Sequence, residues 1–197
     1  MGSFTWSPHA LLAFLASYLL FPQWELNQLG NYMESVLKAN IDYLLELATT
    51  LSGKKSSTLR YKLVRKEVFL STANLSAAFI RMSSEPKSKQ RNKQEIYEFV
   101  VLNHMLSSNV AGVIAGIPAG EPPTCQTEAL HVVKRSIHTL EESLRYIDKD
   151  YEPRESAIRV ATTLPEERQA GNQLLEQLDF IYKLTSKINK ITFVILR

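Results

Sequence analysis

The chain has 197 residues, of which 45% are hydrophobic and 22% are charged, so it forms a folded core and is not disordered along its length. That length suits one compact domain or two small ones. Its single cysteine, Cys125, excludes an internal disulfide framework and a cysteine-based zinc site, and it indicates a reducing compartment. The formal net charge of +3 is too small to indicate a polyanionic partner on its own.

The positive charge is concentrated in one stretch. Residues 53–93 carry eleven lysines and arginines against two glutamates, whereas residues 94–163 carry six basic and ten acidic residues. A stretch of this kind either contacts phosphates, anionic lipid headgroups or an acidic partner, or forms an ordinary solvated helix face. We predict that its last four cations contact anionic lipid or a partner; these are Lys87, Lys89, Arg91 and Lys93.

Apolar residues recur at steps of three and four over residues 24–51, which predicts a first helix about 42 Å long. It ends at Ser52-Gly53, because glycine tolerates the left-handed turn that closes a helix. Its apolar stripe consists of Leu26, Leu29, Met33, Val36, Leu37, Ile41, Leu44, Leu47 and Leu51.

A second helix is predicted from a serine cap at residue 56 or 57 to the residue before Pro86, where proline forbids continuation. Small residues from 71 to 78 let a neighbouring helix approach closely, and Asn74 among them is expected to be a buried polar group that sets the register. The apolar stripe consists of Leu59, Leu63, Leu70, Ala73, Ala77 and Ile80.

Three more helices follow. The third covers about residues 92–117, and its His104 is expected to pack with a hydrogen bond. The fourth is the most regular, and the fifth begins near Pro165 and runs to the C-terminus. Their stripes consist of Ile96, Phe99, Val100, Asn103, Leu106, Val110 and Ile114 in the third, Leu130, Val133, Ile137, Leu140, Leu144, Ile147 and Tyr151 in the fourth, and Leu174, Leu178, Ile181, Thr185, Ile188, Thr192 and Ile195 in the fifth.

These patterns predict an all-α fold, because no segment shows the alternation of period two that a half-buried strand requires. The long amphipathic helices indicate a mostly antiparallel bundle of four to five long helices.

The N-terminal segment from Ala10 to Phe21 differs from the rest, because it is apolar and uncharged. Twelve helical residues rise only about 18 Å, too little to span a bilayer of roughly 30 Å alone. The segment lacks the basic start of a signal peptide, and Trp6 does not fit the myristoylation pattern. Two interpretations remain, a core helix of the bundle or the cytoplasmic half of a transmembrane helix.

Two blocks of residues resemble the fusaric acid resistance-like (FUSC) family, in particular its YccS/YhfK-type inner-membrane branch. The run FLASYLLFPQWE at residues 14–25 is similar to the exit of the last membrane helix in that family. The stretch RKE at residues 65–67, with TANLSAAF at 72–79 and EPKS at 85–88, is similar to the cytoplasmic helix that follows. The order and spacing of the blocks match, and together they cover about residues 14–88.

The resemblance implies a C-terminal cytosolic domain of a multi-spanning efflux-type protein, on the cytoplasmic side of a bacterial inner membrane. Residues 1–22 would then be the end of a transmembrane-like or docking apolar helix, and residues 23–197 a helical-bundle cytosolic domain. Its expected partners are its own transmembrane domains, a second copy in a homo-oligomer and anionic lipid headgroups. Family members related to aromatic-acid and fusaric-acid efflux set the expectation of transport.

The remaining polar residues show no catalytic or metal-binding pattern. His131 and His138 are seven residues apart, whereas helical metal ligands pair at three or four, and Cys125 lacks a base and an oxyanion site nearby in the sequence. There is no phosphate-binding glycine motif. We therefore expect no enzyme activity, no cofactor, no metal and no nucleic-acid binding. The alternative function is a free-standing cytoplasmic helical module for protein interaction.

Overall fold

The computed structural model describes residues 8–54, 57–84, 92–117, 125–153 and 173–197, with side chains described from Gln28 onward. Five long helices make up these residues, and no strand occurs among them. The predicted all-α fold is therefore confirmed. The helices are α1 (Pro8–Leu51), α2 (Thr58–Ser83), α3 (Lys93–Gly116), α4 (Gln126–Ile147) and α5 (Gln173–Leu196).

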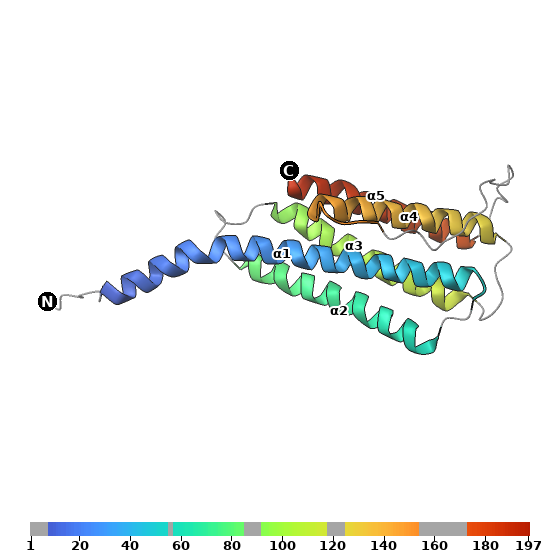
Figure 1. Cartoon of the computed structure of the whole chain (residues 1–197), viewed down its shortest axis with the longest axis horizontal. Coiled ribbons are helices and arrows are strands. Elements are labelled where there is room, and N and C mark those ends of the chain that lie inside the picture. The colour runs from blue at the N-terminus through green and yellow to red at the C-terminus, as the bar shows by residue number, and fades with distance from the viewer. Residues whose placement is uncertain (1–7, 55–56, 85–91, 118–124, 154–172) are drawn as a thin grey trace.

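Four of the helices enclose the main core, and the fifth packs on their outside. α1 packs against α3 and α4, and α5 packs against the same two helices, so these four form a closed bundle. α2 packs against α1 and α3. The N-terminal part of α1 projects beyond the bundle along its long axis (Figure 1). α1 is continuous through residues 22 and 23, where we placed the boundary between the apolar segment and the bundle.

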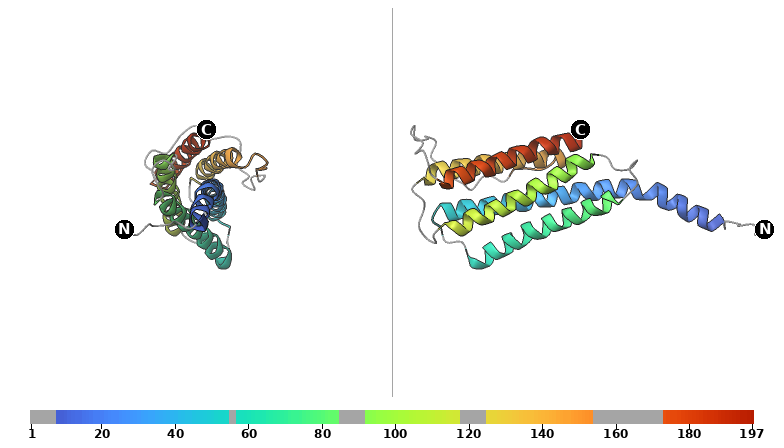
Figure 2. Two further views of the ribbon diagram at one scale, coloured as in Figure 1. Left: turned by 90° about the vertical axis from the view of Figure 1, so that its left-hand side faces the viewer. Right: turned by 180° about the vertical axis from the view of Figure 1, so that it is seen from behind.

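One pair of neighbouring helices, α4 and α5, is parallel and so departs from a purely antiparallel bundle. Successive helices from α1 to α4 alternate in direction, but α4 and α5 run parallel (Figures 1 and 2). Their contacts advance together along both helices: Arg135 lies 4.2 Å from the ring centre of Tyr182, and the Tyr146 and Phe193 ring centres lie 5.5 Å apart. The connection over residues 148–172 is long enough to return along α4, because a helix of 22 residues is only about 33 Å long.

The predicted stripes of four helices are the buried ones. The stripe of α1 is buried from Leu29 to Leu51, and those of α3, α4 and α5 are buried except for partly exposed residues toward their ends. The predicted start of α5 near Pro165 and the side chain of Leu26 lie outside the described part of the chain. The largest fully buried side chains are Tyr43, Phe99, Met33, Leu37, Ile41, Leu44, Leu47, Leu51, Leu75, Ile96, Leu106 and Leu140.

In α2 the predicted stripe faces solvent, so that prediction was wrong. All six of its residues are exposed, and Leu59 reaches 68%. The helix instead buries Val68, Ser71, Thr72, Leu75, Ala78 and Met82. The two hydroxyls on this face both donate to the carbonyl oxygen of Val68, at 3.1 and 2.7 Å, so they can be buried without an unpaired polar group. The small side chains let α2 approach α1 and α3.

The buried polar contact is not the one predicted. Asn74 and His104 are both exposed, so neither has the packing role that the sequence suggested. Asn40 of α1 and Asn103 of α3 are buried instead, and Asn40 Nδ2 donates to Asn103 Oδ1 at 3.1 Å. Each amide also donates to a carbonyl one turn back in its own helix. This pair sets the register of α1 against α3.

Among the described helices, α3 has the length and apolar composition to cross a membrane. In this structure it packs against α1, α2 and α5, and its apolar stripe forms part of the bundle core. A core helix satisfies the same test of length and composition as a membrane span.

Candidate functional site

The candidate site is the end of the bundle at which α1 leaves it. Three helix ends meet α1 there: the C-terminus of α2, the N-terminus of α3 and the C-terminus of α5 (Figure 2). At this end of the bundle, Gln28 of α1 lies opposite Arg81 and Met82 of α2. The site therefore joins the projecting part of α1 to the end of α2 and the start of α3.

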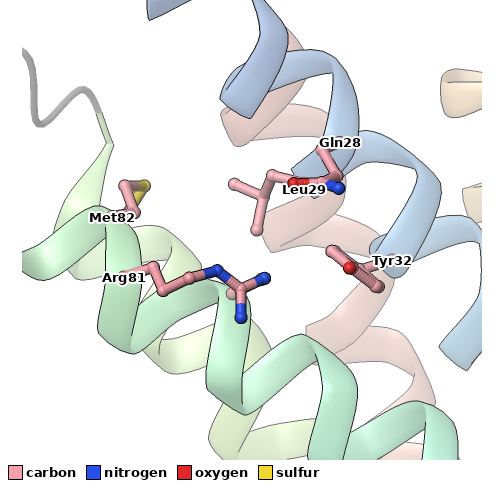
Figure 3. A pocket seen from close by; sticks show the side chains of 6 residues that line it. Gln28, Leu29, Tyr32, Arg81 and Met82 are labelled. Atoms are coloured by element: carbon pink, nitrogen blue, oxygen red, sulfur yellow. The ribbon is translucent and has the colours of Figure 1, made fainter. Parts of the chain in front are cut away.

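A shallow pocket lies between α1 and the last turn of α2 (Figure 3). Leu29 and Met82 are 6% and 7% exposed and provide its apolar wall, and the Arg81 side chain extends from α2 across the gap toward α1 (Figure 3). Tyr32 and Gln28 add polar atoms on the α1 side. A single cation over an apolar wall can hold a carboxylate or phosphate oxygen at this rim.

The start of α3 is tied to the end of α5 by one side chain. Asn92 has the left-handed backbone angle φ of 49°, and its Nδ2 donates to the carbonyl oxygen of Ile195 at 3.0 Å. This bond occupies one of the carbonyls that a helix end leaves without an intrahelical partner. It holds Lys93, the first residue of α3, beside the C-terminus of α5.

Of the four predicted contact residues, the structure places one. Lys93 is exposed at this end, whereas Lys87, Lys89 and Arg91 lie outside the described residues. Arg81 and Arg197, which were not among the predicted residues, are exposed at the same end, and none of the ion pairs within the described ranges involves them. Arg81 belongs to the basic stretch and was identifiable in principle. Arg197 was not, because only the tertiary structure brings the C-terminus beside the start of α3.

A second polar cluster lies near the opposite end, between α1 and the start of α2. The Glu46 carboxylate is 1% exposed, and its Oε2 lies 3.4 Å from Nε of Arg60, whose side chain is 68% exposed. Neither carboxylate oxygen has a hydrogen-bond partner within the described part of the chain. The Tyr43 and Tyr61 ring centres lie 6.4 Å apart, and burial, reinforced by Tyr61, raises the pKa of the Tyr43 phenol well above its ordinary value. The cluster joins α1 to α2 and keeps Tyr43 neutral.

The histidines and the cysteine do not form a common site. His138 Nε2 lies 3.5 Å from Oε1 of Glu142 one turn away, and Cys125 directly precedes α4. Among the described residues, no three histidine, cysteine, aspartate or glutamate side chains gather closely enough to hold a metal ion.

Comparison with known proteins gives two relatives. The chain is 27% identical over 104 residues to an uncharacterized protein of Haemophilus influenzae. The aligned region covers 53% of this chain and 14% of that protein. The chain is also 23% identical over 168 residues to the inner membrane protein YccS of Escherichia coli. This aligned region covers 85% of this chain and 22% of YccS. The chain is related to an inner membrane protein. The matched region spans less than a quarter of either relative, no family model matches the chain, and no solved structure matches it.

Proposed function

We propose that this chain is a cytosolic regulatory or assembly domain of a multi-spanning efflux-type transporter, on the cytoplasmic side of a bacterial inner membrane. The similarity to YccS supports this, because it extends over 85% of the chain but over only 22% of the membrane protein. A region of that proportion is what a separate domain of a larger membrane protein would occupy. An exporter of aromatic acids such as fusaric acid is the transport activity that the sequence resemblance favours.

The observation that carries the proposal is the direction in which α1 leaves the bundle. Its N-terminal part, which contains the apolar run Ala10–Phe21, projects from the same end that presents Arg81, Lys93 and Arg197 (Figure 1). Cations beside the cytoplasmic end of an apolar segment favour contact with anionic headgroups. In this arrangement α1 joins the bundle to the transmembrane domains, and the end of α2 and the start of α3 face the lipid surface.

Vesicle flotation tests the lipid contact. The full chain is mixed with vesicles of phosphatidylcholine alone or with about one third phosphatidylglycerol, and compared with a variant in which Lys87, Lys89, Arg91 and Lys93 are replaced by glutamine. Each basic residue near an anionic surface contributes about 1 kcal/mol, so four neutral substitutions weaken binding by up to about a thousandfold at low salt.

The matched control replaces four exposed lysines elsewhere by glutamine, namely Lys54, Lys134, Lys183 and Lys187. It lowers the net charge equally, so equal loss of binding in both variants would show nonspecific attraction. A chain without residues 1–22 should bind more weakly still, because it lacks the apolar segment. If the full chain does not bind either vesicle, the membrane function is wrong and the free-standing interaction module becomes the better account.

A further inference from the structure

The outer face of α2 carries a heptad seam without a partner helix. Its positions follow steps of four and three without a break, and all seven side chains are exposed. This spacing is the one that two helices use to pack along a shared seam, with side chains of one inserted between those of the other. The seam consists of Leu59, Leu63, Lys66, Leu70, Ala73, Ala77 and Ile80.

The polarity of α2 is reversed relative to a simple surface helix. Two hydroxyl side chains, Ser71 and Thr72, lie on the face that packs against the bundle. The outer face instead carries four large aliphatic side chains, each between 47% and 68% exposed. The seam from Leu59 to Ile80 extends for about 32 Å along the helix. A contiguous apolar surface of this extent indicates an interaction site.

The charges on and beside the seam determine which partner fits. Lys66 occupies a seam position, and Lys62 occupies a flanking position that faces a partner helix. Arg60 and Arg81 flank the other edge, where Arg60 pairs with Glu46 of α1 and Arg81 extends toward α1 (Figure 3). Glu67 is the one carboxylate of α2. None of the ion pairs in the described part of the chain involves Lys62, Lys66 or Arg81. The complement to this surface is therefore apolar in the middle and acidic at its edges.

A second copy of α2 does not satisfy this condition. In a parallel pair Lys66 would meet its own copy within the seam. In an antiparallel pair that places Leu63 opposite Ile80, Arg60 of one copy would lie beside Arg81 of the other. Both arrangements bring cations together at the interface, which disfavours association.

A lipid surface is also a poor complement. Ala73 and Ala77, in the second half of the seam, would insert little apolar volume, and none of the seam residues is aromatic. Interfacial helices use tryptophan, phenylalanine and leucine along their buried face. Alanines within a seam instead let another helix approach closely.

We propose that the outer face of α2 binds an amphipathic partner helix that has leucines at its seam positions and glutamates or aspartates at the flanking positions. The partner's aliphatic side chains pack over Ala73 and Ala77, and its carboxylates pair with Lys62 and Lys66. Opposite charges at the flanking positions select the partner and its orientation.

The test uses a fluorescent peptide of 28 residues with leucine at the seam positions and glutamate at the flanking positions, and a second peptide with lysine in place of glutamate. Repulsion between the like charges at the flanking positions prevents each peptide from pairing with itself. The fluorescence anisotropy of the peptide therefore reports its binding to the full chain. We expect the glutamate peptide to bind at least about tenfold more tightly than the lysine peptide. Replacing Leu63 and Ile80 together by glutamine should weaken binding about tenfold or more.

Charge reversal provides the decisive comparison. Replacing Lys62 and Lys66 by glutamate should transfer the preference to the lysine peptide, which a merely adhesive apolar surface would not do. The matched controls are Phe193 and Val194 replaced by glutamine, and Lys134 and Lys183 replaced by glutamate, all of them exposed on α4 or α5. These controls should leave peptide binding unchanged, and circular dichroism checks that every variant is folded.

Three results would overturn the proposal. Equal binding of both peptides would show that charge does not select the partner. Dimerisation of the chain in sedimentation velocity, abolished by the Leu63 and Ile80 variant, would assign the face to a second copy. Binding to anionic vesicles that depends on Leu63 and Ile80, without binding to the glutamate peptide, would assign it to lipid.

Discussion

The buried amide pair between α1 and α3 makes a quantitative prediction about stability. Asn40 and Asn103 are 1% and 0% exposed, and one hydrogen bond of 3.1 Å joins them. Replacing Asn103 by alanine removes this bond, worth about 1 kcal/mol, and leaves one N–H of the Asn40 amide without a partner at about 1–3 kcal/mol. The free energy of unfolding should therefore fall by about 2–4 kcal/mol.

Replacing Asn40 by alanine should cost less stability than replacing Asn103. Oδ1 of Asn40 has no hydrogen-bond partner in the described part of the chain, so Asn40→Ala removes a buried unpaired oxygen together with the bond. The expected loss is smaller than that of Asn103→Ala by about 1 kcal/mol. Each single variant loses the bond and leaves the other partner's group unpaired, whereas the double variant loses the bond once and leaves neither group unpaired. Its loss should therefore fall short of the sum of the single losses by about 2–3 kcal/mol.

Urea unfolding followed by circular dichroism measures these three losses by linear extrapolation. Asn74→Ala is the control, because Asn74 is an exposed asparagine in the middle of α2 and its replacement should change stability by no more than about 0.5 kcal/mol. Additive single losses, or a larger loss for Asn40→Ala than for Asn103→Ala, would refute the assigned hydrogen-bond pattern.

Two further predictions concern the polar cluster between α1 and α2. Arg60→Ala should lower the free energy of unfolding by about 1–3 kcal/mol, because it leaves the buried Glu46 carboxylate without its cation. Glu46→Gln should lower it less or raise it, because no buried charge remains. Equal losses for the two variants in urea unfolding would contradict this. Tyr43 contributes stability that is fully present below pH 10 and is lost as the pH rises toward its raised folded-state pKa, because only the unfolded chain ionises readily in that window. Between pH 9 and 11.5 the wild type should lose about 2 kcal/mol more than Tyr43→Phe, as measured by urea unfolding at each pH.

The helices and most of the core were predictable from the sequence because burial imposes a local pattern. A helix that covers a core repeats its apolar side chains at steps of three and four, and the stripes of α1, α3, α4 and α5 follow this rule and are buried. The termini of α1 and α2 near residues 51 and 57 followed from a glycine turn and a serine cap, and Ser57 Oγ accepts from the N–H of Arg60 at 3.1 Å.

The candidate site was predictable only in part. The basic stretch over residues 53–93 led to the prediction of four contact cations, and Lys93, the one that the structure describes, is exposed at the start of α3. The contribution of Arg197 and the bond from Asn92 to Ile195 join residues about a hundred positions apart. Such pairs leave no trace in local composition or spacing.

The sequence by itself determined that this chain is a set of long amphipathic helices, because each stripe is a property of a single helix. It did not determine which side of α2 faces the bundle, since Val68, Leu75 and Met82 form one seam and Leu59, Leu63 and Leu70 another. Only the tertiary structure decided this, through the fit of small side chains against α1 and α3. It also decided the parallel course of α4 and α5 and the pairing of Asn40 with Asn103. The energies that select these arrangements arise between segments distant in the chain, where periodicity carries no information.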